Sequence, residues 1–144
     1  MFNLTILAKS ESYYLGHEYE TVVLVERASG VEQVIADHYG DPTCAVIGPD
    51  ETWAIVGGEG VTFFDFKGGR TEFFRKGSPP IDRSESTWFV HDMRLDGPDK
   101  VRILFDPWSK YASVWLLRCL DLQLVKIKDG PILIGKPYRE KIEF

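Results

Sequence analysis

Short runs of apolar residues, separated by turn residues, make up most of the chain. Residues 2–8 alternate between two faces, whereas residues 21–25 are apolar and β-branched on both faces, which favours a central strand. The later runs are too short for ordinary helices and end at glycine, proline or aspartate. Further strands are predicted at residues 44–47, 53–56, 61–66, 71–74, 88–95, 100–105, 111–118 and 122–127.

Two segments are open to more than one interpretation. In residues 29–39, Gly30 suits a hairpin turn from which a strand returns. Ser29 and Glu32 also fit the capping box of a helix. Because the β-branched residues at 31, 34 and 35 are poor helix formers, the hairpin strand is favoured. Residues 138–144 fit a last helical turn and a frayed tail equally well.

The tripeptide Gly-Pro-Asp occurs at 48–50 and again at 97–99, an offset of 49 residues. This offset is close to the length of a kelch-type propeller blade, although two or three such units do not close a propeller. The repetition marks two weakly similar meander units, or it is a coincidence in a turn-rich chain. In either case the sequence predicts an all-β or β-dominated fold, with antiparallel meanders packed as a sandwich or a partly open barrel.

The length of 144 residues, with 44% hydrophobic residues, suits one domain spanning 1–144 with an ordinary globular core. No apolar run approaches the roughly 18 residues of a membrane span. Residues 1–8 are mildly apolar but lack the basic start of a signal peptide. We therefore expect a soluble, cytoplasmic protein that does not bind membranes.

The formal net charge of −5 is unevenly distributed. Residues 1–60 hold ten acids and two bases, a net charge of −8, whereas the remaining residues carry +3. An acidic half repels nucleic-acid phosphates and anionic lipid and attracts basic proteins. Lys67, Arg70, Arg75 and Lys76 are too widely spread to form the basic stripe that nucleic acids require. Direct nucleic-acid binding is therefore not expected.

No catalytic or metal-binding motif is present. Each of His17, His38 and His91 adjoins an acid, but neighbouring residues on a strand point to opposite faces. Cys44 and Cys119 match small core residues better than activated nucleophiles. The sequence contains no HExxH, G-x-S-x-G or GxGxxG motif, and residues 57–60 suit a hairpin turn. We expect no metal, no cofactor and no enzymatic activity.

Size, charge and missing motifs together favour a protein-binding module whose acidic surface covers a basic partner. Small acidic bacterial immunity proteins that neutralise nuclease-type toxins are of this general type. The carboxylates of such a protein would pair with the Lys and Arg side chains that the toxin uses for phosphate.

The tryptophan at 108 differs from the other three tryptophans, which lie inside predicted strands. It stands in a proline-marked loop next to charged residues, where aromatic side chains are often interface anchors. The sequence fits equally well with a structural role, in which the indole of this tryptophan packs over the edge of a sheet. With this residue included, the candidate partner-binding residues are Glu18, Glu20, Asp41, Asp50, Glu51, Glu59, Asp106 and Trp108.

Two other classes of function remain open. A self-assembling scaffold subunit would pair its strand edges with copies of itself. A small enzyme or ligand-binding domain would need a site assembled from dispersed residues such as His38, His91 and Asp106. Convergence of these side chains in one pocket would favour the enzyme. The identity of the partner and the oligomeric state are not encoded in any recognisable pattern.

Overall fold

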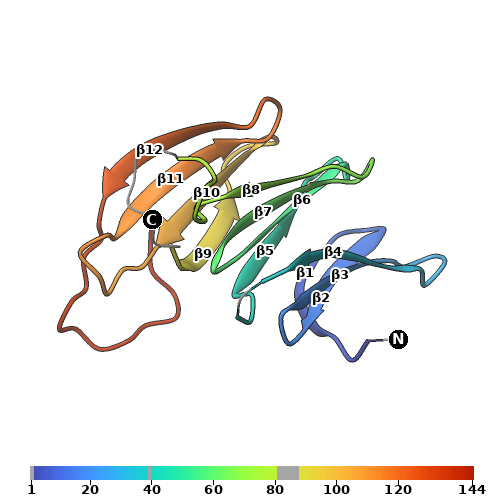
Figure 1. Ribbon diagram of the computed structural model, residues 1–144, viewed down its shortest axis with the longest axis horizontal. Coiled ribbons are helices and arrows are strands. Elements are labelled where there is room, and N and C mark those ends of the chain that lie inside the picture. The colour runs from blue at the N-terminus through green and yellow to red at the C-terminus, as the bar shows by residue number, and fades with distance from the viewer. Residues whose placement is uncertain (1, 39, 81–87) are drawn as a thin grey trace.

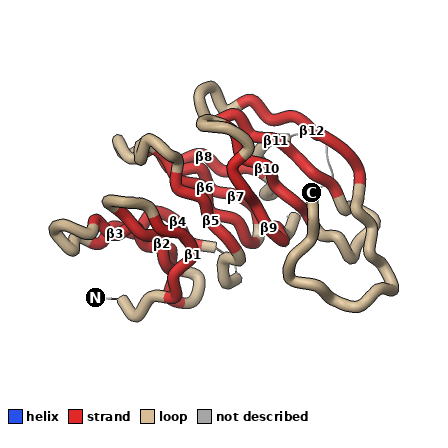
Figure 2. Tube along the Cα trace, turned by 180° about the vertical axis from the view of Figure 1, so that it is seen from behind, coloured by secondary structure: helices blue, strands red, loops and turns tan. Residues whose placement is uncertain are grey.

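The computed structural model describes residues 2–38, 40–80 and 88–144, and these residues form β-strands and no helix (Figures 1 and 2). The predicted all-β class is therefore confirmed. The strands are β1 (Thr5–Lys9), β2 (Tyr13–Glu18), β3 (Thr21–Glu26), β4 (Glu32–Asp37), β5 (Cys44–Ile47), β6 (Trp53–Gly58), β7 (Gly60–Asp65), β8 (Arg70–Phe73), β9 (Val90–Leu95), β10 (Lys100–Phe105), β11 (Ser113–Arg118) and β12 (Gln123–Asp129).

The strands form three antiparallel four-stranded sheets, each a meander in chain order. We call them the first sheet (β1–β4), the middle sheet (β5–β8) and the last sheet (β9–β12). The two Gly-Pro-Asp copies occupy the first hairpin turn of the middle and last sheets, so they mark equivalent positions. The sequence left open whether the tripeptide marks repeated meander units. The described strands form three meanders, and Ser10-Glu11-Ser12 stands in place of the tripeptide in the first of them. The described strands do not close into a barrel.

The three sheets lie side by side like a fan, with their first strands closest together (Figure 1). Strand β5 lies between β1 and β9, while β4, β8 and β12 are the far edges of their sheets. Consecutive four-stranded meanders around a common line of first strands are arranged as the blades of a propeller. Three such sheets form only an arc of a ring.

The middle sheet is buried on both faces, and this explains the continuous apolar runs of its strands. Ile55 and Phe63 point into a core shared with the last sheet, where they meet Ile103. The alternate residues Ala54 and Phe64 point into a second core shared with the first sheet. Each face of β6 and β7 therefore packs against a different neighbouring sheet.

Most predicted strands are present with ends shifted by one to three residues, and the hairpin interpretation of residues 29–39 is confirmed by β4. Strand β2 was missed, because its central residue is glycine and its ends are polar. A side chain at Gly16 would have its Cβ 2.8 Å from Leu4 Cβ and 2.9 Å from the Thr5 carbonyl oxygen. Glycine is therefore required at this position, because Leu4 and Thr5 lie too close to the strand for a side chain.

The C-terminal residues form neither a helix nor a strand but a segment held against the last sheet. The Phe144 ring is buried against Leu104 and Val114, on the face turned away from the middle sheet. The Arg94 guanidinium donates to the Phe144 carbonyl oxygen. Residues 138–144 were predicted as a helical turn or a frayed tail and are neither, because these packing and hydrogen-bond contacts hold a non-helical segment on the last sheet.

A carboxylate joins the first and middle sheets at the end where their first hairpins turn. Glu51, in the β5–β6 turn, accepts hydrogen bonds from the Ser10 hydroxyl and from the Ser12 backbone N–H at 2.9 Å, both in the β1–β2 turn. These hydrogen bonds hold the pKa of the Glu51 carboxyl below its usual value. The contact therefore depends on the ionised form of Glu51.

Replacing Gly16 by alanine is expected to destabilise the protein by about 1–3 kcal/mol, because the added methyl group overlaps Leu4 and backbone. Thermal and urea unfolding would measure the change. Gly69→Ala is the matched control, since a Cβ at Gly69 meets no atom within 4 Å. Equal effects of the two substitutions would contradict the close approach at β2.

The Glu51 contact predicts a pH dependence of folding stability. Because folding lowers the pKa of Glu51, its contribution is present above the unfolded-state pKa and is lost as the pH falls through the folded-state pKa. Urea unfolding across the acid range should therefore show a shallower loss of stability in Glu51→Gln than in the wild type. Glu11→Gln, an exposed change in the same β1–β2 turn, should leave the profile unchanged.

Candidate functional site

The meander topology divides the predicted acidic residues between opposite ends of the sheets. Asp50 and Glu51 lie in the β5–β6 turn, at the end that also holds the β1–β2 and β9–β10 turns. The other six predicted residues lie at the opposite end, in or beside the β2–β3 turn, the β4–β5 loop, the β6–β7 turn and the β10–β11 loop; they are Glu18, Glu20, Asp41, Glu59, Asp106 and Trp108. The predicted acidic residues of the first half of the sequence therefore do not form one continuous surface.

Four of these carboxylates form what we call the acidic end: Glu18, Glu20, Asp41 and Glu59. The β4–β5 loop links the turns that carry these residues. At its start, the His38 backbone N–H donates a hydrogen bond to the Glu20 carbonyl oxygen of the β2–β3 turn at 3.0 Å. The same loop packs on the β6–β7 turn, where a Cβ at Gly58 would lie 2.9 Å from the Pro42 Cα. Glu20 and Asp41 are exposed, whereas Glu18 is half-buried and accepts the Asn3 backbone N–H at 2.9 Å.

Tyr19 lies in the β2–β3 turn, between Glu18 and Glu20, and was not predicted. Its side chain is 80% exposed, and its φ of 51° places a bulky residue in the left-handed region. The His17 ring donates from Nδ1 to the Tyr19 carbonyl oxygen at 2.8 Å, which fixes the turn. A strained, exposed aromatic residue between two glutamates is the type of residue that anchors protein interfaces. The signal in the sequence was Glu-Tyr-Glu between two strands.

A partly buried chain of polar side chains lies behind the acidic end. Arg75 Nη2 donates to His38 Nδ1 at 3.0 Å, and Arg75 Nε lies 3.6 Å from Glu72 Oε2. Glu72 in turn accepts the Thr62 hydroxyl at 2.8 Å. Because Nδ1 accepts, the His38 ring carries its proton on Nε2 and is neutral. Burial lowers the pKa of His38 to about 4, and the Arg75 charge adds to this effect.

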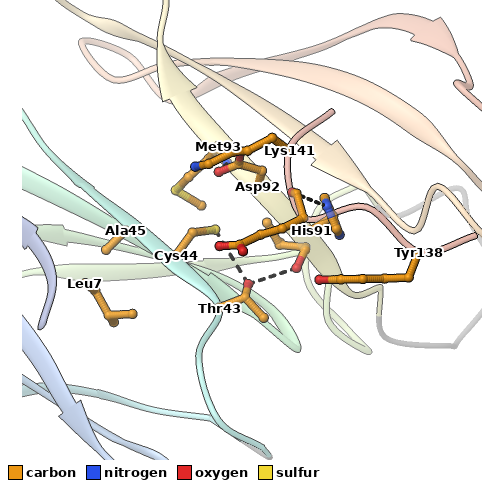
Figure 3. A pocket seen from close by; sticks show the side chains of 11 residues that line it. Leu7, Thr43, Cys44, Ala45, His91, Asp92, Met93, Tyr138 and Lys141 are labelled. Carbon is orange, nitrogen blue, oxygen red and sulfur yellow. Dashed lines mark hydrogen bonds between the residues drawn. The ribbon is translucent and has the colours of Figure 1, made fainter. Parts of the chain in front are cut away.

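A cavity of about 420 Å³ lies where the first strands of the three sheets meet (Figure 3). Thr43 and Cys44 on the β5 side, His91 and Asp92 of β9, and Tyr138 of the C-terminal segment line it. The His91 ring donates from Nε2 to the Glu140 carbonyl oxygen at 2.8 Å. This histidine therefore holds the C-terminal segment in place.

Neither cysteine is placed as a nucleophile. Burial raises the pKa of the Cys44 thiol to about 12, and it also raises the pKa of Cys119 to about 12. Both thiols are therefore protonated at neutral pH, whereas nucleophilic attack requires the thiolate. The cavity brings Cys44 and His91 to one place without the charges that would activate the sulfur.

The residues of the predicted dispersed site do not all converge. His91 and Asp106 border one hollow of about 170 Å³ together with Trp108, whereas His38 lies behind the acidic end. Within residues 2–38, 40–80 and 88–144, no group of His, Cys, Asp or Glu side chains is arranged to hold a metal ion. The Trp108 ring stacks on Tyr138 at 5.1 Å, and its Nε1 donates to the Lys136 carbonyl. The indole thus binds the C-terminal segment of its own chain.

No protein-family model matches this sequence, and no curated protein matches it. Among solved structures, the fold is similar to part of the tricorn protease crystal structure, with a TM-score of 0.56 and 11% sequence identity. The match covers 88% of this chain and 13% of the tricorn protease chain. Because the identity is so low, this similarity concerns the fold alone. In the part of the chain that the structure describes, no helix has the length and hydropathy of a membrane span.

The His38 environment predicts a second pH effect. Since folding lowers the pKa of this base from 6.5 to about 4, the unfolded chain binds more protons between these values. The free energy of unfolding should fall by up to about 3 kcal/mol as the pH drops from 7 to 4. Urea unfolding of His38→Gln should lack this fall, while His17→Gln, at a half-buried site, should retain it. A wild-type profile that is flat between pH 6.5 and 5 would contradict the neutral buried histidine.

Proposed function

We propose that this protein is a non-enzymatic protein-binding module whose acidic end covers a basic protein partner. The observation that supports this is that four carboxylates lie at one end of the sheets, in or beside turns of the first and middle sheets, and that the exposed ring of Tyr19 lies in one of these turns. Arg75, behind this end, is engaged with His38 and Glu72. A partner with Lys and Arg side chains would meet negative charge and an exposed aromatic ring at the same end.

A nuclease-type toxin is the partner class that this surface fits best, with the protein acting as its bacterial immunity protein. A nuclease binds phosphate through a basic site, and carboxylates that pair with that site both speed association and exclude the substrate. Tyr19 would supply the buried contact that slows dissociation. The cytoplasm, where such a toxin acts on nucleic acid, is the compartment that this role implies.

The interior chemistry also supports binding over catalysis. The thiols of Cys44 and Cys119 stay protonated, and the His91 ring is occupied by the Glu140 carbonyl. The 420 Å³ cavity thus offers no activated nucleophile among its lining residues.

The charges of the acidic end can be tested with matched reversals at its two exposed carboxylates. The partner is isolated from cells of the source organism on the immobilised protein, and association is then measured at 0.01 M and 0.1 M salt. Glu20→Lys and Asp41→Lys should slow association at least about tenfold at low salt, because they remove electrostatic steering. Asp50→Lys makes the same charge change at the opposite end and should leave the association rate close to that of the wild type.

Tyr19→Ala should act mainly on the dissociation rate constant of the complex. Loss of a buried aromatic anchor is expected to cost about 2 kcal/mol of affinity, mainly through faster dissociation. The proposal fails if the captured partner is neutral or acidic, or if association ignores both salt and the Glu20 and Asp41 reversals. Equal effects of Asp50→Lys and Glu20→Lys would also count against the acidic end as the binding surface.

A further inference from the structure

The first and last sheets each have a face that is turned away from the middle sheet, and we call these the open faces. On the open face of the first sheet, Val34 is 47% exposed and Ile6 is 43% exposed. Along β4, Val34 is flanked by Glu32 and Asp37, which are both exposed and share its face. Lys9 lies on the same face at the opposite edge, on β1. The β4 side of this face is thus an apolar centre between two acids.

The open face of the last sheet has the corresponding pattern with the opposite charge. Val125 is 54% exposed, and it lies next to half-buried Leu116 on β11. Along β12, Val125 is flanked by Gln123 and by exposed Lys128. Arg118, next to Gln123 on the same face, is bound to Asp121 of its own chain. The C-terminal segment contacts Arg94 of β9, Leu104 of β10 and Val114 of β11, and Val125 of β12 remains exposed.

The two patterns have the same spacing along equivalent strands. Strand β4 presents positions 32, 34 and 37, and β12 presents positions 123, 125 and 128. Each strand is the fourth of its sheet, and each has a bulge between the second and third of these positions. Placed face to face in the same direction, Val34 meets Val125, Asp37 meets Lys128, and Glu32 meets Gln123.

We propose that the open face of the first sheet binds the open face of the last sheet in a second copy of this chain, so that two copies close a ring of six sheets. A propeller has about four to eight sheets, so two chains of three fit this range and three chains do not. Two-fold symmetry repeats the junction twice. Each junction then needs to bury only about half of the ~1,600 Å² of a standard interface.

Sedimentation velocity and light scattering of the purified protein from about 1 to 100 µM provide the test. The expected species at high concentration has twice the 16.4 kDa mass of the chain. Val34→Asp and Val125→Asp should each weaken association at least about tenfold, because each buries a charge twice per ring. Both positions are exposed in the single chain, so thermal unfolding should show both variants folded.

Exchange of the charges at Asp37 and Lys128 tests whether these two residues meet in the contact between copies. Asp37→Lys and Lys128→Asp should each weaken association about tenfold, whereas the double variant should restore it because the pair is re-formed with reversed signs. Lys126→Asp reverses a charge on the other face of β12 and should have no effect on association. Glu20→Lys at the acidic end should also leave the dimer intact, so this test is independent of the proposed function.

Three results would overturn the ring. A monomer at every concentration would exclude the contact. A mass that keeps rising with concentration would show open chains in place of closure by two copies. A dimer that ignores Val34→Asp, Val125→Asp and the charge swap would place its interface elsewhere on the protein.

Discussion

Burial of the middle sheet on both faces is the constraint on which the rest of the structure depends. A sheet with two apolar faces needs a cover on each side, and the first and last sheets supply these covers. The first strands come close together. The β4–β5 loop, which links two of the sheets, passes the end of β6 so closely that glycine is required there, at Gly58 beside Pro42. The polar loops are then displaced to the two ends of the fan, where the acidic end and the Glu51 contact are formed.

The strands were predictable to the extent that turn residues punctuate them. Residues 44–47 and 100–105 are strands with the predicted bounds, because each is a β-rich run between unambiguous turns. The same reasoning failed at β2. Gly16 is required there because Leu4 packs too closely for a side chain, and no local sequence pattern reveals this tertiary contact. The number of sheets was also not predictable. The division of the described strands into three meanders depends on packing between residues far apart in the chain.

The candidate site was predictable in its chemistry and not in its position. The excess of acids in residues 1–60 was visible, but alternate turns of a meander face opposite ends, so Asp50 and Glu51 are separated from Glu20. Glu51 turned out to be engaged in a contact between sheets. Tyr19 was passed over because strand β2 was missed, so the turn that holds Tyr19 was not recognised, and only the structure shows its ring in solvent.

The distribution of tryptophan between the two cores has a spectroscopic consequence. Trp53, Trp88 and Trp115 all pack in the core between the middle and last sheets, and the core between the first and middle sheets contains no tryptophan among its described members. Trp108 lies against Tyr138 of the C-terminal segment, which packs on the last sheet. Intrinsic tryptophan emission therefore reports on the middle and last sheets and not on the first sheet. If the first sheet were to separate while the other two remained packed, the emission would change little. Only probes that follow the backbone or the tyrosines, such as Tyr13, would record the event.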